Sequence, residues 1–376
     1  MNLSHENSLL LCCAQTKLSD NSSVLLNELL CHPLDWECIS ESAFSQNIAQ
    51  LLYHNLKGIT SKHLIPPGVM EKLKRAYCVN IARNMHLYAE FRNITNAFHS
   101  AGIEVIALKG VVLAGIVYRD IGLRPMRDID LLVRKDDLEV AHRIMTDLMY
   151  TPQVKVESEQ WNKQKHFHLP AYRNSDKTVV VEIHWHFAEN SLGIDMQKWW
   201  DRARSENIMG CCIKVPSPED MLIHLCIHLY NHGYTNKFVL RGLCDIAETL
   251  RHYEIEMDWK LLQDEIKNHG IAAQVHSMLY LAGKYFDQGS GLHGLIDLNG
   301  VDHHFLGILE ESLFADQGLE PINPYLLKSM FYDNFLKKAQ YLFPKVFPSR
   351  KEMSKRYPVS PSSKRLFYYY LVHPFH

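Results

Sequence analysis

Two aspartates separated by one residue stand at the start of an apolar run in the middle of the chain. In the segment 124–133, Asp128 and Asp130 alternate with Ile129 and Leu131. Because the side chains of a strand alternate between its faces, both carboxylates lie on one face. Such a pair repels itself unless a cation lies between the acids, and it suits Mg²⁺, which bridges to substrate phosphates. The pattern predicts a metal site for phosphate chemistry; the alternative is a strand start with two solvated acids.

A third carboxylate occurs in a later apolar segment. In the run 179–186, Glu182, His184 and His186 share one face of a predicted strand. An acid among β-branched residues is unfavourable unless it has a cation or a hydrogen-bond partner. Glu182 is therefore a candidate to complete a triad with the two aspartates, and His184 is a candidate to contact substrate or to tune the base. Packing in the core is the alternative for either histidine.

Basic residues precede the aspartates. Lys109 and Gly110 lie between a predicted strand and a short predicted helix. Glycine there permits close approach of a phosphate, lysine neutralises it, and the loop amides and helix N-terminus favour anions. Arg119, Arg124 and Arg127 follow, and guanidinium groups hold polyphosphate oxygens in a bidentate manner. We expect a polyphosphate site here; the alternative for each arginine is a structural ion pair.

Two histidines form a second cluster. His224 and His228 are four residues apart, which places them on one face of a predicted helix, as in some zinc sites. Leu225 stands where the His-Glu-x-x-His motif of zinc proteases has its glutamate. We therefore expect a structural role or a place in a substrate pocket for both histidines, with zinc as the alternative. Asp245, further on, is another candidate pocket residue, or the ion-pair partner that ties the C-terminal helices to the sheet.

The order of these motifs over residues 103–187 resembles a known superfamily. A strand, a Lys-Gly turn and a helix are followed by Arg-x-x-Arg-Asp-x-Asp-Leu-Leu-Val, and then by an apolar strand that ends Glu-x-His-Trp. This order resembles the DNA polymerase β-type nucleotidyltransferases, and more closely the bacterial uncharacterised nucleotidyltransferase family within that superfamily. The superfamily favours Gly-Ser or Gly-Gly-Ser at the turn where this chain has Lys109 and Gly110.

The resemblance implies an enzyme that moves a nucleoside monophosphate from a nucleoside triphosphate to a small-molecule, sugar, peptide or protein acceptor. It implies that Mg²⁺ or Mn²⁺ is the cofactor, and that the catalytic metal ligands are Asp128, Asp130 and Glu182. Nucleotide binding then falls to Lys109, Gly110, Arg124 and Arg127. The alternative is a catalytically weak nucleotide-binding or scaffold protein with the same fold.

The elements that must position these residues follow from hydrophobic periodicity, which changes from helical to alternating near residue 100 and back again near residue 190. We predict an α+β fold in which a small mixed β-sheet is flanked by helices. The predicted strands are 103–108, 129–133, 154–156 and a hairpin over 166–186. The predicted helices include 69–100, 136–149, 218–230, 237–251, 259–268 and 271–286. The predicted domains are an N-terminal helical region (1–100), a nucleotidyltransferase-like core (101–190) and a C-terminal helical region (191–376).

Composition narrows the function classes. The chain has 376 residues, 47% of them hydrophobic, and a formal net charge of −2, which argues against a nucleic-acid partner that needs a broad basic surface. Nine cysteines include two adjacent pairs and no C-x-x-C spacing, which favours a reducing, cytoplasmic setting. No apolar run approaches the roughly 18 residues that span a bilayer. A near-neutral total still permits a small basic pocket.

Overall fold

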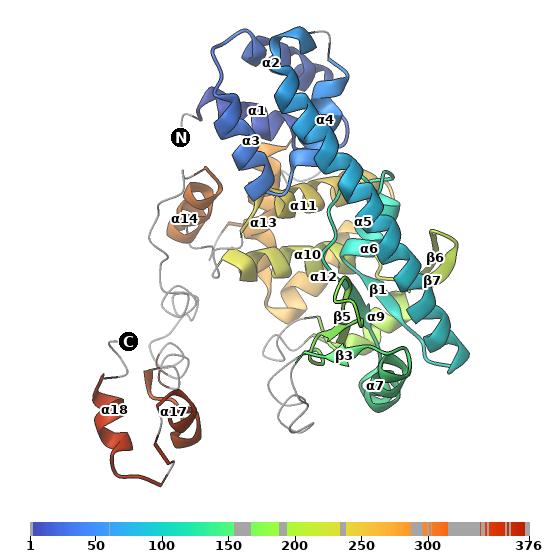
Figure 1. The fold of residues 1–376 in the computed structure, drawn as a ribbon, viewed down its shortest axis with the longest axis vertical. Helices are drawn as coiled ribbons and strands as arrows, with labels where there is room; N and C mark the ends of the chain where they lie inside the picture. Colours follow the sequence, from blue (N-terminus) through green and yellow to red (C-terminus); the bar gives the residue numbers. More distant parts are fainter. Residues whose placement is uncertain are drawn as a thin grey trace. The chain divides into compact units, whose positions relative to one another are not determined.

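The computed structural model of the chain contains helices before and after a mixed β-sheet, so the predicted α+β class is confirmed (Figure 1). It describes residues 3–59, 61–153, 167–187, 194–233, 238–286, 296–298, 301, 303–314, 339, 343, 346–357, 359, 360 and 362–372. The chain forms two compact units: residues 1–230 with 239–301, and residues 231–238 with 302–376. The predicted boundaries near residues 100 and 190 stay predictions.

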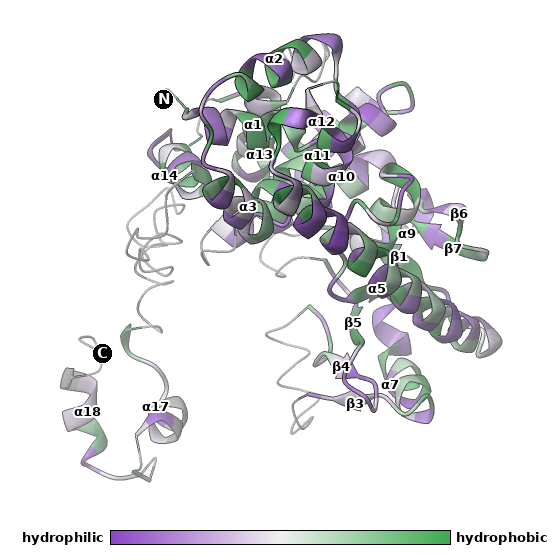
Figure 2. Cartoon of the chain, turned by 45° about the horizontal axis from the view of Figure 1, so that its top comes forward, coloured by the Kyte–Doolittle hydropathy of each residue, from purple (hydrophilic) through white to green (hydrophobic). Residues whose placement is uncertain are grey.

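Helices make up the chain before the sheet. Ser4, Ser19 and Asp35 begin the first three helices, because each side chain accepts a backbone N–H that has no partner inside the helix. These helices and those that follow are α1 (His5–Cys13), α2 (Asp20–Leu30), α3 (Trp36–Ser45), α4 (Ala49–Lys57), the short 3₁₀ helix η1 (Lys62–Leu64) and α5 (Pro67–Ser100). Figure 2 shows hydrophilic and hydrophobic segments mixed along α5, as a helix with one buried side requires.

Seven strands of the described chain form one mixed sheet in the order β3-β4-β5-β2-β1-β7-β6. They are β1 (Ile106–Leu108), β2 (Ile129–Leu132), β3 (Thr151–Pro152), β4 (Tyr172–Arg173), β5 (Val180–His184), β6 (Arg204–Ile208) and β7 (Cys211–Val215). The predicted hairpin is confirmed where it is described, since β4 and β5 pair antiparallel. The predicted strand 154–156 lies outside the described residues. The β6–β7 hairpin was not predicted.

Short helices connect the strands, and long helices follow them. The connecting helices are α6 (Gly110–Val112), the π-helix η2 (Leu113–Val117), η3 (Lys135–Asp137), α7 (Leu138–Asp147) and α9 (Met196–Arg202). The long helices are α10 (Pro218–His232), α11 (Leu240–His252), α12 (Trp259–His269) and α13 (Ala272–Tyr285). Among the described residues, no helix has the length and apolar character to cross a membrane.

One face of the central strands packs against α9. Ile106, Leu108 and Leu132 form a buried cluster with Trp200 of that helix. In the antiparallel pairing, Ile106 is opposite Leu132 and Leu108 is opposite Asp130. Directly opposed residues share a face of the sheet, so Asp130 points to the side that α9 partly covers.

The second unit contains α14 (His303–Phe314), α17 (Arg350–Arg356) and α18 (Leu366–Val372). Gly233 packs against α14 so closely that a Cβ there would lie 2.5 Å from Leu309 Cδ2. The rings of Tyr357 and Tyr369 stack with their centroids 4.4 Å apart. The first contact packs residue 233 against α14, and the second joins the segments of α17 and α18.

Asn84 of α5 fastens the loop that leads into β2. Its side-chain amide donates to the backbone carbonyls of Ile121 and Arg124, and its Oδ1 accepts the backbone N–H of Met126 at 3.3 Å. Asn84 is fully buried, so no bulk water can replace these bonds. The long helix therefore sets the position of the segment that carries the aspartates.

We expect Asn84→Ala to lower the free energy of unfolding by about 1–3 kcal/mol, because it leaves buried backbone groups without partners. Denaturant unfolding of the full chain measures this loss. Asn93→Ala changes an exposed asparagine of the same helix and should change the value by less than about 0.5 kcal/mol. Equal effects of the two substitutions would contradict the anchoring role.

Candidate active site

The sheet brings two of the three predicted acids together. In the parallel pair β2–β5, Asp130 is in register with Glu182, so their side chains project from neighbouring positions of one face. Asp130 is only 2% exposed, whereas the Glu182 side chain is 26% exposed. Asp128 lies just before β2 and is partly buried. The pattern of alternate residues in two strands therefore produces a compact acidic group at the start of β2.

Two basic groups lie among these acids. Lys109 Nζ is 3.1 Å from Asp130 Oδ1, and His184 Nε2 is 2.9 Å from the same oxygen. His184 Nε2 also lies 3.4 Å from Glu182 Oε2, so the imidazole bridges the two carboxylates. Phe167 stacks on the His184 ring, with centroids 6.0 Å apart. The predicted proximity of His184 to the acids is thus observed, and its Nδ1 is buried without a hydrogen-bond partner.

The charges shift one another's pKa values strongly. Burial and the negative charge of Asp130 raise the pKa of Asp128 to about 6. Burial opposes ionisation of Asp130 too, but Lys109 and His184 outweigh it and hold its pKa well below the usual range. The His184 hydrogen bond lowers the pKa of Glu182. Burial opposes the charge on His184, yet the two carboxylates raise its pKa. Ionised Asp128 leaves the cluster with one more negative than positive group, which favours a cation.

The donor atoms fit a divalent metal ion. One ligand atom each from Asp130, Glu182 and His184 lie within 4.8 Å of one another. Carboxylate oxygens are the ligands that Mg²⁺ and Mn²⁺ prefer, and an imidazole is acceptable to Mn²⁺. Asp128 is not a member of this three-residue group, although its charge acts on Asp130. Asp130 and Glu182 would hold the ion, with His184 or Asp128 as the further ligand.

Lys109 reaches Asp130 from a strained backbone. Its φ of 41° and ψ of −110° lie in a region that favours glycine, and a non-glycine residue there costs about 1–3 kcal/mol. A Cβ on the next residue, Gly110, would lie 3.3 Å from Arg124 Nη1 and 3.7 Å from the carbonyl oxygen of Asp128. The turn therefore brings the ammonium group and the loop before β2 close together. The short helix predicted after this turn is present as α6, which continues directly into η2, so the helical segment spans residues 110–117.

Arg124 is held inside the fold. Its Nε and Nη2 each donate to Asp245 at 2.9 Å, and Tyr118 Oη donates to the same carboxylate at 2.9 Å. Both members of the ion pair are buried. The predicted tie between Asp245 and an arginine or histidine is therefore confirmed. Because the carboxylate already has three donors, Asp245 has little capacity left for a substrate.

The other predicted residues lie at different depths. Arg127 is exposed and donates to Asn47 Oδ1 at 3.2 Å. His224 is 1% exposed and its two ring nitrogens have no hydrogen-bond partner; burial keeps its pKa well below the usual range, so it is neutral. Its ring contacts Phe187 and His228, with centroid distances of 5.2 and 6.2 Å. The two helical histidines belong to no group of three metal ligands in the described chain.

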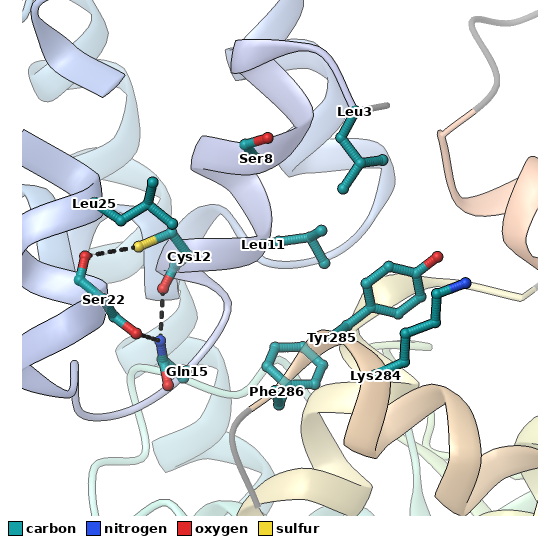
Figure 3. Close-up of a pocket in the computed structure, with 10 residues that line it drawn as sticks. All are labelled: Leu3, Ser8, Leu11, Cys12, Gln15, Ser22, Leu25, Lys284, Tyr285 and Phe286. Carbon is teal, nitrogen blue, oxygen red and sulfur yellow. Dashed lines mark hydrogen bonds between the residues drawn. The ribbon is translucent and has the colours of Figure 1, made fainter. Parts of the chain in front are cut away.

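A pocket of about 330 Å³ lies elsewhere in the first unit (Figure 3). Apolar side chains such as Leu11 of α1 and Phe286 after α13 line it together with polar ones such as Gln15 and Ser22. Burial raises the pKa of the Cys12 thiol to about 11, which makes it a poor nucleophile. None of the predicted site residues lines this pocket, so we place the candidate chemistry at the acidic cluster.

Comparison with known proteins relates the chain to one family. A sequence model described as uncharacterised nucleotidyltransferase matches residues 32–287. The match extends from just before α3 to the end of α13 and includes the whole sheet. No curated protein matches the chain.

Asp128→Asn should raise the free energy of unfolding of the metal-free protein. The pKa of Asp128 in the folded protein, about 6, exceeds the ordinary 3.8, so folding favours the protonated acid. The stability from that proton is complete below the unfolded pKa and is lost as the pH rises through about 6. The variant avoids this loss, so its advantage should be on the order of 2 kcal/mol at about pH 7.5 and small near pH 4.

Denaturant unfolding in the presence of a chelator, repeated across this pH range, measures the advantage. Asp136→Asn removes an exposed acid of η3 and should show no such pH dependence. Destabilisation by Asp128→Asn near neutral pH would show that the carboxylate is favourably paired in the folded state, contrary to the electrostatic description above.

Proposed function

The chain belongs to the uncharacterised nucleotidyltransferase family, and from that premise we propose that it transfers a nucleoside monophosphate from a nucleoside triphosphate to an acceptor hydroxyl. The observation that supports this proposal is the register of Asp130 with Glu182 beside Asp128, which gathers metal-binding oxygens on one face. We propose Mg²⁺ or Mn²⁺ as the cofactor. When bound, the metal lowers the pKa of the attacking hydroxyl and neutralises phosphate charge.

The side chains divide the remaining work. Asp130 would hold the metal with Glu182, Asp128 would add a nearby negative charge, and Lys109 would neutralise phosphate oxygens. Glu182 is the more exposed acid of the aligned pair, so we assign it the proton of the acceptor hydroxyl. A bond forms between the acceptor oxygen and the α-phosphorus, the bond from that phosphorus to the bridging oxygen breaks, and pyrophosphate leaves.

A second candidate function is nucleotide binding without efficient turnover. The Lys109–Asp130 ion pair favours it, because the ammonium group occupies an oxygen that the catalytic metal needs. This turn also differs from the Gly-Ser turns of the superfamily, because Lys109 adopts a strained backbone conformation. Release of pyrophosphate in the presence of sugar, peptide and protein acceptors distinguishes an enzyme from such a binding protein. The proposed acceptor is a small molecule, a sugar, a peptide or a protein.

The double variant Asp128→Asn with Asp130→Asn should weaken metal-dependent binding of nucleoside triphosphates by about tenfold or more, because it removes metal-binding carboxylates. Titration of the full-length protein with each of the four triphosphates, with Mg²⁺ or Mn²⁺ and then with chelator, measures the effect. The matched control, Asp136→Asn with Asp137→Asn, removes the same charge from η3 and should bind as the wild type does. Unchanged binding by the first pair would refute the site assignment.

A further inference from the structure

Two guanidinium groups converge on one carbonyl in the loop before β2. Arg241 Nη1, from the first turn of α11, donates to the Pro125 carbonyl at 3.1 Å, and Arg124 Nη1 is 3.4 Å from the same oxygen. Arg124 is neutralised by Asp245, as described above. Arg241 enters this region from a distant part of the sequence, more than a hundred residues after Pro125.

Arg241 lacks an equivalent anionic partner. In the part of the chain that the structure describes, no carboxylate lies within ion-pair distance of it, and its Nε is buried without a hydrogen-bond acceptor. Burial and the positive charge of Arg124 lower the pKa of Arg241, and the negative charge of Asp245 opposes them only in part. A partly buried cation with an unused buried donor is costly unless an anion pairs with it. The free protein thus keeps a positive group at this position that has no direct ion pair with the described residues.

The position of Arg241 relative to the acids is set by the central strands. Gly110 follows β1 and lies against Arg124, whereas Glu182 belongs to β5 on the opposite side of β2. Arg241 shares the Pro125 carbonyl with Arg124, so it belongs to the β1 side. If the α-phosphate lies at Asp130, Arg241 lies toward β1 and Glu182 lies toward β5.

The first turn of α11 is fixed by the α3–α4 connection. Gln46 Oε1 accepts the backbone N–H of Leu240 at 2.7 Å, and the Gln46 carbonyl accepts that of Arg241 at 3.3 Å. The neighbouring Asn47 accepts a hydrogen bond from Arg127. Two consecutive residues of the α3–α4 connection, Gln46 and Asn47, thus position the start of α11 and Arg127.

We propose that Arg241 and Arg127 form a subsite for the β- and γ-phosphates of the nucleoside triphosphate, an inference that rests on the proposed nucleotidyl transfer. Lys109 and Arg124 form ion pairs with Asp130 and Asp245, whereas Arg127 and Arg241 form none with the described residues. Guanidinium groups bind phosphate oxygens through paired hydrogen bonds, so the unused donors of Arg241 match this ligand. The acceptor approaches from the β5 side.

Binding of a triphosphate and of its monophosphate tests the subsite. The probe is whichever of ATP, GTP, CTP and UTP binds the wild-type full chain most tightly with Mg²⁺, and the comparison is the corresponding monophosphate. Arg241→Gln with Arg127→Gln should weaken triphosphate binding by about ten- to a hundredfold and change monophosphate binding by less than about twofold. Arg241→Lys should recover part of the loss, since lysine keeps the charge but not the paired donors.

Arg143→Gln removes an exposed guanidinium from α7 and should leave both affinities unchanged. Equal loss of the two ligands by the double variant, or no loss of either, would overturn the subsite. Monophosphate binding also shows that the variant is folded. If the wild-type chain binds none of the four triphosphates, the proposed function itself fails, which is a different result from normal triphosphate binding by the arginine variants.

Discussion

The buried ion pair between Arg124 and Asp245 is the constraint on which the site depends. It joins α11 to the loop that runs into β2, across 121 residues of sequence, and Tyr118 adds a third bond to the same carboxylate. Asn84 holds the same loop from the side of α5. Removing one partner of a buried pair costs about 3–5 kcal/mol, because the other charge stays desolvated. One helix before the sheet in the sequence, α5, and one after it, α11, therefore position the segment that carries the acids.

With that loop fixed, Asp128 and Lys109 are each held in an energetically unfavourable state. Asp128 is held where its ionised form is unfavourable, and Lys109 accepts a backbone conformation that glycine would adopt at lower cost. Neither feature stabilises the metal-free protein. Strained or repelling groups that persist in a fold cluster at functional sites, because ligand binding relieves what folding alone does not. The cluster at the start of β2 has this character, whereas the buried Arg124 pair does not.

The sequence was sufficient for the fold class and for the meeting of Asp130 with Glu182. Both acids lie in short apolar runs with two-residue alternation, and the antiparallel β1 and parallel β5 lie on either side of β2. The β6–β7 hairpin escaped prediction because β6 carries Arg204, Ser205, Glu206 and Asn207, which have little of the character of a buried strand. Its attachment to the sheet is through β7 and β1, which are about a hundred residues apart in sequence and leave no local signal.

The arginines show what spacing alone does not determine. Arg119, Arg124 and Arg127 are the same residue type and all lie within nine residues of Asp128, yet an acid on α11 pairs with Arg124. A cation is available to a ligand only if no acid of the folded protein already pairs with it. Which acids lie beside it depends on the three-dimensional structure and not on sequence spacing. By that measure Arg241, over a hundred residues from the aspartates, has a stronger claim to phosphate than Arg124, four residues from the first of them. Charge left unpaired by folding, rather than charge nearby in sequence, is what a polyphosphate can use.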